Sequence, residues 1–204
     1  MSYFYLETHP EKQSELEQLG VTLEGTAFVG NNCEVGANSF LSDETRVNSR
    51  SIVGADTILH ECARVTSESF VGSNCEIDEG TAIRHSQVGD NVHVETGCYI
   101  EHSKIGDDVW VGPNSVIVNS TIVNGAIIGE GSIVFDTEIL PHDKVIPAGS
   151  MFAASCHASP TFFQAVWQHS QAIRTEAESY THGKHRLDVH RARNDNDYLE
   201  RMQP

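Results

Sequence analysis

Aliphatic residues recur along the chain at intervals of six, from Leu23 to Ile146. Of the 21 steps between successive marked residues, eighteen are six residues long and three are five. The fifth residue of nearly every six-residue block is small: Ala, Cys, Ser, Thr or Val. An α-helix repeats every 3.6 residues and an ordinary strand every two, so neither explains a period of six. The pattern predicts a solenoid in which each block forms one short strand and the corner after it.

The three shortened blocks follow one phrase, apolar-x-(His/Asn)-Ser-x-apolar, which begins at Ile83, Ile100 and Ile117. Three blocks close one triangular turn, so a turn has about 18 residues, or about 17 where one block is short. Residues at that spacing therefore lie one above another, ~4.8 Å apart. We expect three vertical columns in this stretch: Arg84, Glu101 and Val118; His85, His102 and Asn119; and Ser86, Ser103 and Ser120.

The same register assigns the remaining inward positions. The serine column predicts hydrogen-bonded corners. Near the end of the coil, the six-residue step after Val134 places Leu140 on the inner wall. Three cysteines fall on the small inward position, which predicts that they are packing thiols: Cys33, Cys75 and Cys98.

This pattern resembles the hexapeptide-repeat family, whose members form left-handed parallel β-helices and usually assemble as trimers. The resemblance covers about residues 23–151 and implies a mainly-β fold of about seven triangular coils, assembled as a homotrimer. Residues 1–22 are predicted to cap the open end, with a short helix in PEKQSELEQLG between a proline and a glycine. An amphipathic α-helix is expected within residues 152–181, followed by a polar tail at 182–204.

Charge and cysteine content limit which partners and which cellular location we expect. Residues 1–158 hold 7 Lys and Arg against 23 Asp and Glu, whereas residues 159–204 hold 6 against 6. Such an acidic body argues against binding to nucleic acid or an anionic membrane, since both need a basic surface. The five cysteines show no CxxC pairing, and the first residues lack the pattern of a signal peptide. We therefore expect a cytoplasmic protein.

The layout of a coil followed by one helix is similar to γ-class carbonic anhydrases, which bind a divalent metal between subunits with three histidines. Aligned by coil register, the ligand positions of that family fall on Arg84, Thr96 and Glu101, and its pocket glutamine falls on Asp78. None of these residues is histidine. The resemblance therefore implies that standard carbonic anhydrase activity is absent.

Three functional interpretations remain open. The first is an acyltransferase that uses acetyl-CoA or another acyl-CoA on a small hydroxyl or amine substrate, with His102 as general base, His85 as its substitute and Glu101 as an orienting residue. The second is a displaced divalent-metal site, for example for zinc, built on His85 and His102 with Glu101 beside them. The third is a binding or scaffold trimer without catalysis.

An acidic wall is a separate feature of the register. Four acidic residues fall on consecutive turns: Glu61, Asp78, Glu79 and Glu95. We expect a hydrated acidic face there in preference to a calcium site. His93 is predicted to lie on a different wall from His85 and His102.

Overall fold

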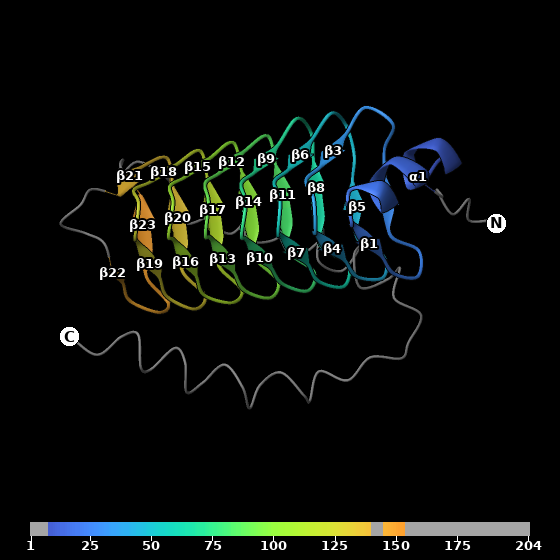
Figure 1. Ribbon diagram of the computed structural model, residues 1–204. Coiled ribbons are helices and arrows are strands. Elements are labelled where there is room, and N and C mark those ends of the chain that lie inside the picture. Colours follow the sequence, from blue (N-terminus) through green and yellow to red (C-terminus); the bar gives the residue numbers. More distant parts are fainter. Residues whose placement is uncertain (1–7, 140–144, 154–204) are drawn as a thin grey trace, which may run out of the picture.

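The computed structural model describes residues 8–139 and 145–153, and these form a three-sided parallel β-helix (Figure 1). Each turn adds one strand of two or three residues to each of three parallel sheets. Sheet A contains β1 (Thr22–Leu23), β4 (Phe40–Leu41), β7 (Ile58–Leu59), β10 (Glu76–Ile77), β13 (His93–Val94), β16 (Trp110–Val111), β19 (Ile127–Ile128) and β22 (Val145–Ile146).

The other two walls are built in the same way. Sheet B contains β2 (Phe28–Val29), β5 (Arg46–Val47), β8 (Arg64–Thr66), β11 (Ala82–Arg84), β14 (Tyr99–Glu101), β17 (Val116–Val118), β20 (Ile133–Phe135) and β23 (Met151–Ala153). Sheet C contains β3 (Glu34–Val35), β6 (Ile52–Val53), β9 (Phe70–Val71), β12 (Gln87–Val88), β15 (Lys104–Ile105), β18 (Thr121–Ile122) and β21 (Glu138–Ile139).

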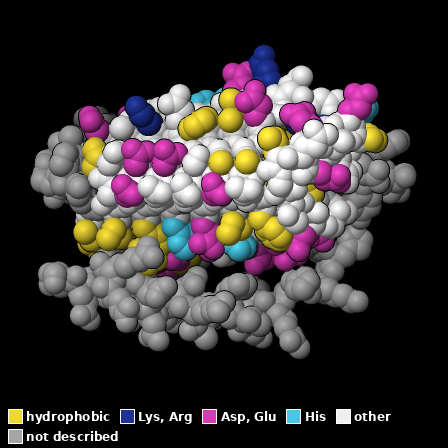
Figure 2. All heavy atoms as spheres, viewed as in Figure 1, with side chains coloured by type: hydrophobic (Ala, Val, Ile, Leu, Met, Phe, Trp, Pro, Cys, Tyr) yellow, Lys and Arg dark blue, Asp and Glu magenta, His cyan; other side chains and the backbone are white. Residues whose placement is uncertain are grey.

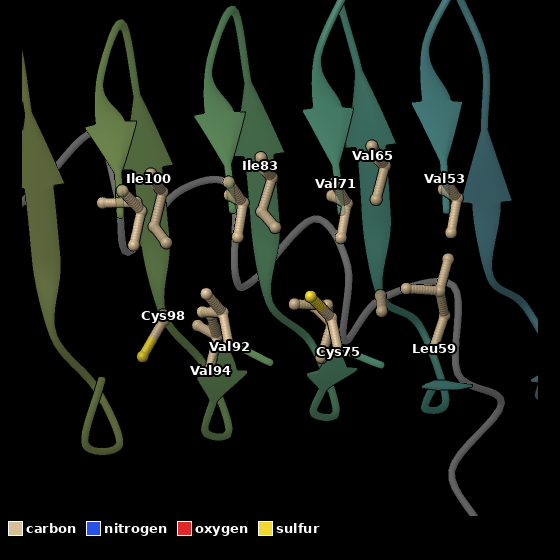
Figure 3. Packing of buried hydrophobic residues seen from close by; sticks show 14 of the residues in the cluster. Val53, Leu59, Val65, Val71, Cys75, Ile83, Val92, Val94, Cys98 and Ile100 are labelled. Atoms are coloured by element: carbon tan, nitrogen blue, oxygen red, sulfur yellow. The ribbon is translucent and has the colours of Figure 1, made fainter. Parts of the chain in front are cut away.

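The aliphatic residues of the six-residue pattern fill the inside of the coil. Ile83 pairs with Ile100 and Ile100 with Ile117 in successive strands of sheet B, and all three side chains are completely buried. Figure 3 shows Val65, Ile83 and Ile100 following one another along the inside of this wall. The predicted vertical stacking is therefore confirmed, and the backbone N–H and C=O groups of each turn pair with those of its neighbours.

Strand β21 corrects the predicted register near the end of the coil. Ile139 pairs with Ile122 and is completely buried, so it takes the inward position that the pattern assigned to Leu140. The step from Val134 to Ile139 is thus a fourth shortened block, in which Thr137 occupies the small position and donates its N–H to Ser120 Oγ at 3.3 Å. The prediction was wrong because a strict six-residue step ignored the repeat of the corner sequence as FDT in place of VNS.

A short helix covers the open end of the coil. Helix α1 (Pro10–Gln18) begins at the predicted proline, and its Leu16 is 1% exposed and joins the core of the first turns. The predicted C-terminal helix begins at residue 152, but Met151–Ala153 form β23. The rest of that helix and the polar tail at 182–204 lie outside the described residues. Within the described part of the chain, no helix is long and apolar enough to cross a membrane.

The cysteines of the coil are buried free thiols, as predicted for Cys33, Cys75 and Cys98. Burial raises the pKa of the Cys75 thiol to about 11 and that of Cys62 to about 12, and the Glu44 carboxylate adds to the effect at Cys62. The thiolate is the reactive form of cysteine. We therefore expect iodoacetamide at pH 8 to alkylate Cys62 and Cys75 at least ~100-fold more slowly in the native protein than in the unfolded chain.

Peptide mass spectrometry of samples taken over time measures these rates, and the same protein in guanidinium chloride is the control. Equal rates in the two states would show that these corners open readily.

Candidate functional site

One corner of the coil, between sheets B and C, holds the histidines predicted to be functional. His85, His102 and Asn119 lie one above another with φ values of 47°, 49° and 50°, and Asp136 continues the column with φ 48°. Asn, Asp and His tolerate this left-handed conformation better than most side chains. The corner therefore selects these residue types through its backbone, whatever chemistry they carry.

The two imidazoles of this column face each other. The rings of His85 and His102 are stacked, with their centroids 4.7 Å apart and their planes 16° from parallel. The backbone N–H of His102 donates to the carbonyl of Arg84 at 3.1 Å, which connects this corner to the turn before it. Both side chains are exposed, so both can reach a ligand in solution.

The serines beside them are structural. The Ser86 hydroxyl accepts the N–H of Ser103, and the Ser103 hydroxyl accepts the N–H of Ser120, each at 3.1 Å. Each hydroxyl also donates to a carbonyl two residues back, as Ser103 does to Glu101 at 2.8 Å. The predicted corner hydrogen bonds are confirmed, and the ladder extends to Ser69 and Thr137. These hydroxyls are buried and fully used, so none is placed to act as a nucleophile.

A shallow hollow lies next to the histidines. Its volume is about 460 Å³, and its lining includes His85, Gln87, His102, Lys104 and Thr121. Lys104 is exposed on the outer face of β15, two residues after His102, and brings a positive charge to the hollow. The hollow therefore combines imidazole, ammonium and hydroxyl groups, which suits a polar or anionic ligand.

Glu101 lies on the sheet B side of the same corner. It is half-buried, and its carboxylate together with nitrogen atoms of His85 and His102 forms a group of donors within 4.8 Å of one another. Burial raises the pKa of the neighbouring Tyr99, and the Glu101 carboxylate acts in the same direction. The structure thus brings together all three residues predicted for the site: His85, Glu101 and His102.

The positions equivalent to the carbonic anhydrase ligands do not form a site within this chain. Arg84 and Glu101 are neighbours at the ends of β11 and β14, as predicted. Thr96 lies at a different corner, between β13 of sheet A and β14 of sheet B, where its carbonyl accepts the N–H of Asn114.

A second group of metal-binding residue types, on sheet A, was not predicted. It comprises His60, Glu76 and Asp78, with donor atoms within 4.8 Å of one another, and His93 lies beside it. The sequence contained the signal, because Asp78 follows His60 by 18 residues and His93 follows Glu76 by 17. The predicted register grouped Asp78 with other acidic residues and placed His93 on a different wall from His102. It did not predict that Asp78 and His93 lie side by side. His93 does lie on that different wall.

Burial changes two ionisable groups beside this second cluster. Glu95 is buried, which raises its pKa to about 7, while the nearby His93 opposes the shift. For His93 itself, burial acts to lower the pKa, but the Asp78 and Glu76 carboxylates outweigh burial and raise it. The predicted acidic face is therefore an imidazole–carboxylate face at its centre.

Solved structures that are similar to this chain include acyltransferases. A UDP-N-acetylglucosamine acyltransferase matches with 16% identity and a TM-score of 0.50, and the match covers 63% of this chain and 64% of that chain. A putative acetyltransferase, the product of the BC4754 gene of Bacillus cereus, matches with 12% identity over 78% of this chain and 97% of that chain (TM-score 0.35). The acetyltransferase domain of PglB from Neisseria gonorrhoeae FA1090, in complex with acetyl coenzyme A, matches with 18% identity over 69% and 60% (TM-score 0.25).

These likenesses bear on the fold alone. The chain spans less than two thirds of the UDP-N-acetylglucosamine acyltransferase, and no curated protein matches its sequence. The predicted mainly-β, left-handed parallel β-helix of about seven turns is confirmed, whereas the predicted similarity to the γ-carbonic anhydrase branch is not. The family described as GMPPB C-terminal domain matches residues 47–150, which is more than half of the chain, and the protein therefore belongs to this family.

Proposed function

We propose that this protein transfers an acyl group from a thioester, such as acetyl-CoA, to a hydroxyl or amine of a small molecule, with His102 as the general base. The observation that carries the proposal is the exposed His102 imidazole at the edge of a hollow that also contains Lys104. Imidazole is the side chain best suited to accept and return a proton near neutral pH. A lysine offers a point charge for a phosphate of the acyl donor.

The reaction needs one proton acceptor and a bound thioester. His102 removes the proton of the acceptor hydroxyl or amine while the oxygen or nitrogen attacks the thioester carbonyl. The C–S bond then breaks, and the thiolate leaves with the proton that the imidazolium returns. Stacking on His85 restricts the ring of His102, and Glu101 is close enough to orient it. Assembly as a homotrimer in the cytoplasm is part of the same proposal, with the hollow facing a groove between two coils.

Replacement of His102 by Asn tests the base. Asn already occupies the same corner one turn later, at Asn119, so the variant should keep the backbone conformation. We expect His102→Asn to lower kcat/KM for acetyl transfer from acetyl-CoA by about 100-fold, because a general base contributes roughly that factor or more. Transfer is measured as release of free CoA with a panel of amino sugars and sugar nucleotides as acceptors.

The matched control is His85→Asn, which changes the same column by the same atoms one turn earlier. It should lose no more than about tenfold in activity, because in this proposal His85 restricts the ring of His102 but carries no proton. Equal loss in both variants, or none in His102→Asn, would refute the assignment of the base. A native protein that transfers no acetyl group to any acceptor would refute the reaction.

A divalent metal at the same corner is the second candidate, because His85, Glu101 and His102 place two nitrogen donors and a carboxylate within 4.8 Å. These residues fit a zinc ion by donor type, and a bound zinc ion would lower the pKa of a coordinated water. His102→Asn would then abolish zinc binding at this corner, a result that the acyltransferase proposal does not require.

A further inference from the structure

The outer face of sheet A presents a compact group of imidazoles and carboxylates on three successive turns. Glu76 on β10 pairs with His93 on β13 in neighbouring strands, so their side chains leave the wall side by side. His60 and Asp78 lie two residues beyond the outward residues of β7 and β10, and so point outward as well. In Figure 2, histidine side chains lie on both sides of acidic ones along this wall, with hydrophobic side chains beyond them.

Each imidazole faces both carboxylates. His60 Nε2 lies 3.0 Å from Glu76 Oε1 and 3.8 Å from Asp78 Oδ1. His93 Nε2 lies 3.7 Å from Asp78 Oδ2 and 4.0 Å from Glu76 Oε2. The two carboxylates of the middle turn are thus held between one imidazole from the turn before and one from the turn after.

Hydrogen bonding does not account for this arrangement. Of the four contacts, only that between His60 and Glu76 is short enough to be a hydrogen bond. His93 Nε2 is buried and its nearest acceptors are beyond hydrogen-bond distance. His93 faces the outer oxygens, Glu76 Oε2 and Asp78 Oδ2, so Glu76 Oε1 and Asp78 Oδ1 remain directed at His60.

Separations of this size are those of ligands that share one metal ion. Nitrogen and oxygen ligands about 2.0–2.2 Å from a zinc ion lie roughly 3–4 Å from one another. We propose that His60, Glu76 and Asp78 bind one divalent transition-metal ion on sheet A, with His93 beside the two carboxylate ligands. This site is separate from the corner of His102, since it occupies another wall of the coil.

The ligand types select the class of metal. Imidazole nitrogen suits Zn²⁺, Co²⁺ and similar ions, whereas Ca²⁺ and Mg²⁺ prefer a shell of oxygen. The site is also preorganised: Asp78 is only 16% exposed, and the His93 ring beside it is stacked on Trp110 with centroids 6.2 Å apart. Since the acidic body of the chain attracts cations, charge favours occupancy.

Binding would join two turns of the coil through side chains. His60 directly follows β7 and Asp78 directly follows β10, and these neighbouring strands otherwise contact each other through backbone hydrogen bonds. A ligand that binds only the native state raises the melting temperature by mass action. We therefore expect the metal to act as a clamp on the middle of sheet A.

The test uses the full chain without an affinity tag, purified in the presence of chelator and then dialysed free of it. Zn²⁺ binding is followed by isothermal titration calorimetry and by the melting temperature, and Co²⁺ binding by visible absorption. We expect one zinc ion per chain at this site and a melting temperature that rises with zinc concentration. Glu76→Gln and His60→Ala should each weaken this binding at least ~10-fold, because each removes a ligand.

Two comparisons make the result specific. The double variant His85→Asn and His102→Asn retains every sheet A ligand and should bind zinc like the native protein. Circular dichroism without metal should be the same for all variants, because the replaced side chains lie on the outer face. Zinc affinity that is unchanged in Glu76→Gln and His60→Ala, or lost in the double variant, overturns the proposal, as does a native protein that binds no zinc. None of these results depends on acyl transfer by His102.

Discussion

Replacing Ile100 by Ala is expected to lower the free energy of unfolding by about 4 kcal/mol, because a large inward side chain is lost from the middle of the coil. Ile100 is completely buried between Ile83 and Ile117 on the inner wall of sheet B. The backbone of a β-helix is held by the turns on both sides, so it cannot collapse into the space. The cost then includes a cavity as well as the lost burial of methyl and methylene groups.

An Ile-to-Ala substitution on the outside of the coil is the matched control. Ile52 on β6 is 38% exposed, and its Ala variant should change the free energy of unfolding by less than about 1 kcal/mol. Urea denaturation followed by circular dichroism measures both variants. Similar losses for Ile100→Ala and Ile52→Ala would mean that the inner wall is not the main source of stability.

The inner wall was predictable because its signal repeats at every turn. Ile83, Ile100 and Ile117 each occupy a site that admits only an aliphatic side chain, so the sequence reports the period directly. Leu140 was misplaced because a fourth shortened corner precedes it, although the predicted register returns at Ile146, which is buried and pairs with Ile128. A repeat period predicts which residues point inward, but it does not predict which blocks are shortened at their corners.

The candidate sites were predictable only in part. A spacing of 17 residues correctly placed His85 on His102, because stacking along one column depends on register alone. The cluster of His60, Glu76 and Asp78 joins two columns and two turns, and its distances depend on the directions in which the side chains lean. Register brings such residues within reach of one another, and only the structure shows that their polar atoms converge.

Replacing Gly54 by Ala is expected to cost about 3 kcal/mol, although it adds a single methyl group. Gly54 lies at the corner between sheets C and A, where the backbones of successive turns approach each other closely. A Cβ atom built there would lie 2.5 Å from the carbonyl carbon of Gly72, and 2.6 Å from its oxygen and from the nitrogen of Ser73. These are backbone atoms of the next turn, and Gly54 N–H is itself bonded to Val71 O at 2.8 Å, so neither turn can move without breaking the ladder.

Gly80→Ala is the control that separates crowding from backbone strain. Gly80 has φ +67°, but a Cβ atom there would meet nothing within 4 Å, so only the left-handed conformation opposes the substitution. Its expected cost is about 1 kcal/mol. Urea denaturation should therefore rank Gly54→Ala well below Gly80→Ala in stability. The reverse order would mean that adjacent turns separate easily at this corner, and close contact of the backbones would then not be what requires glycine there.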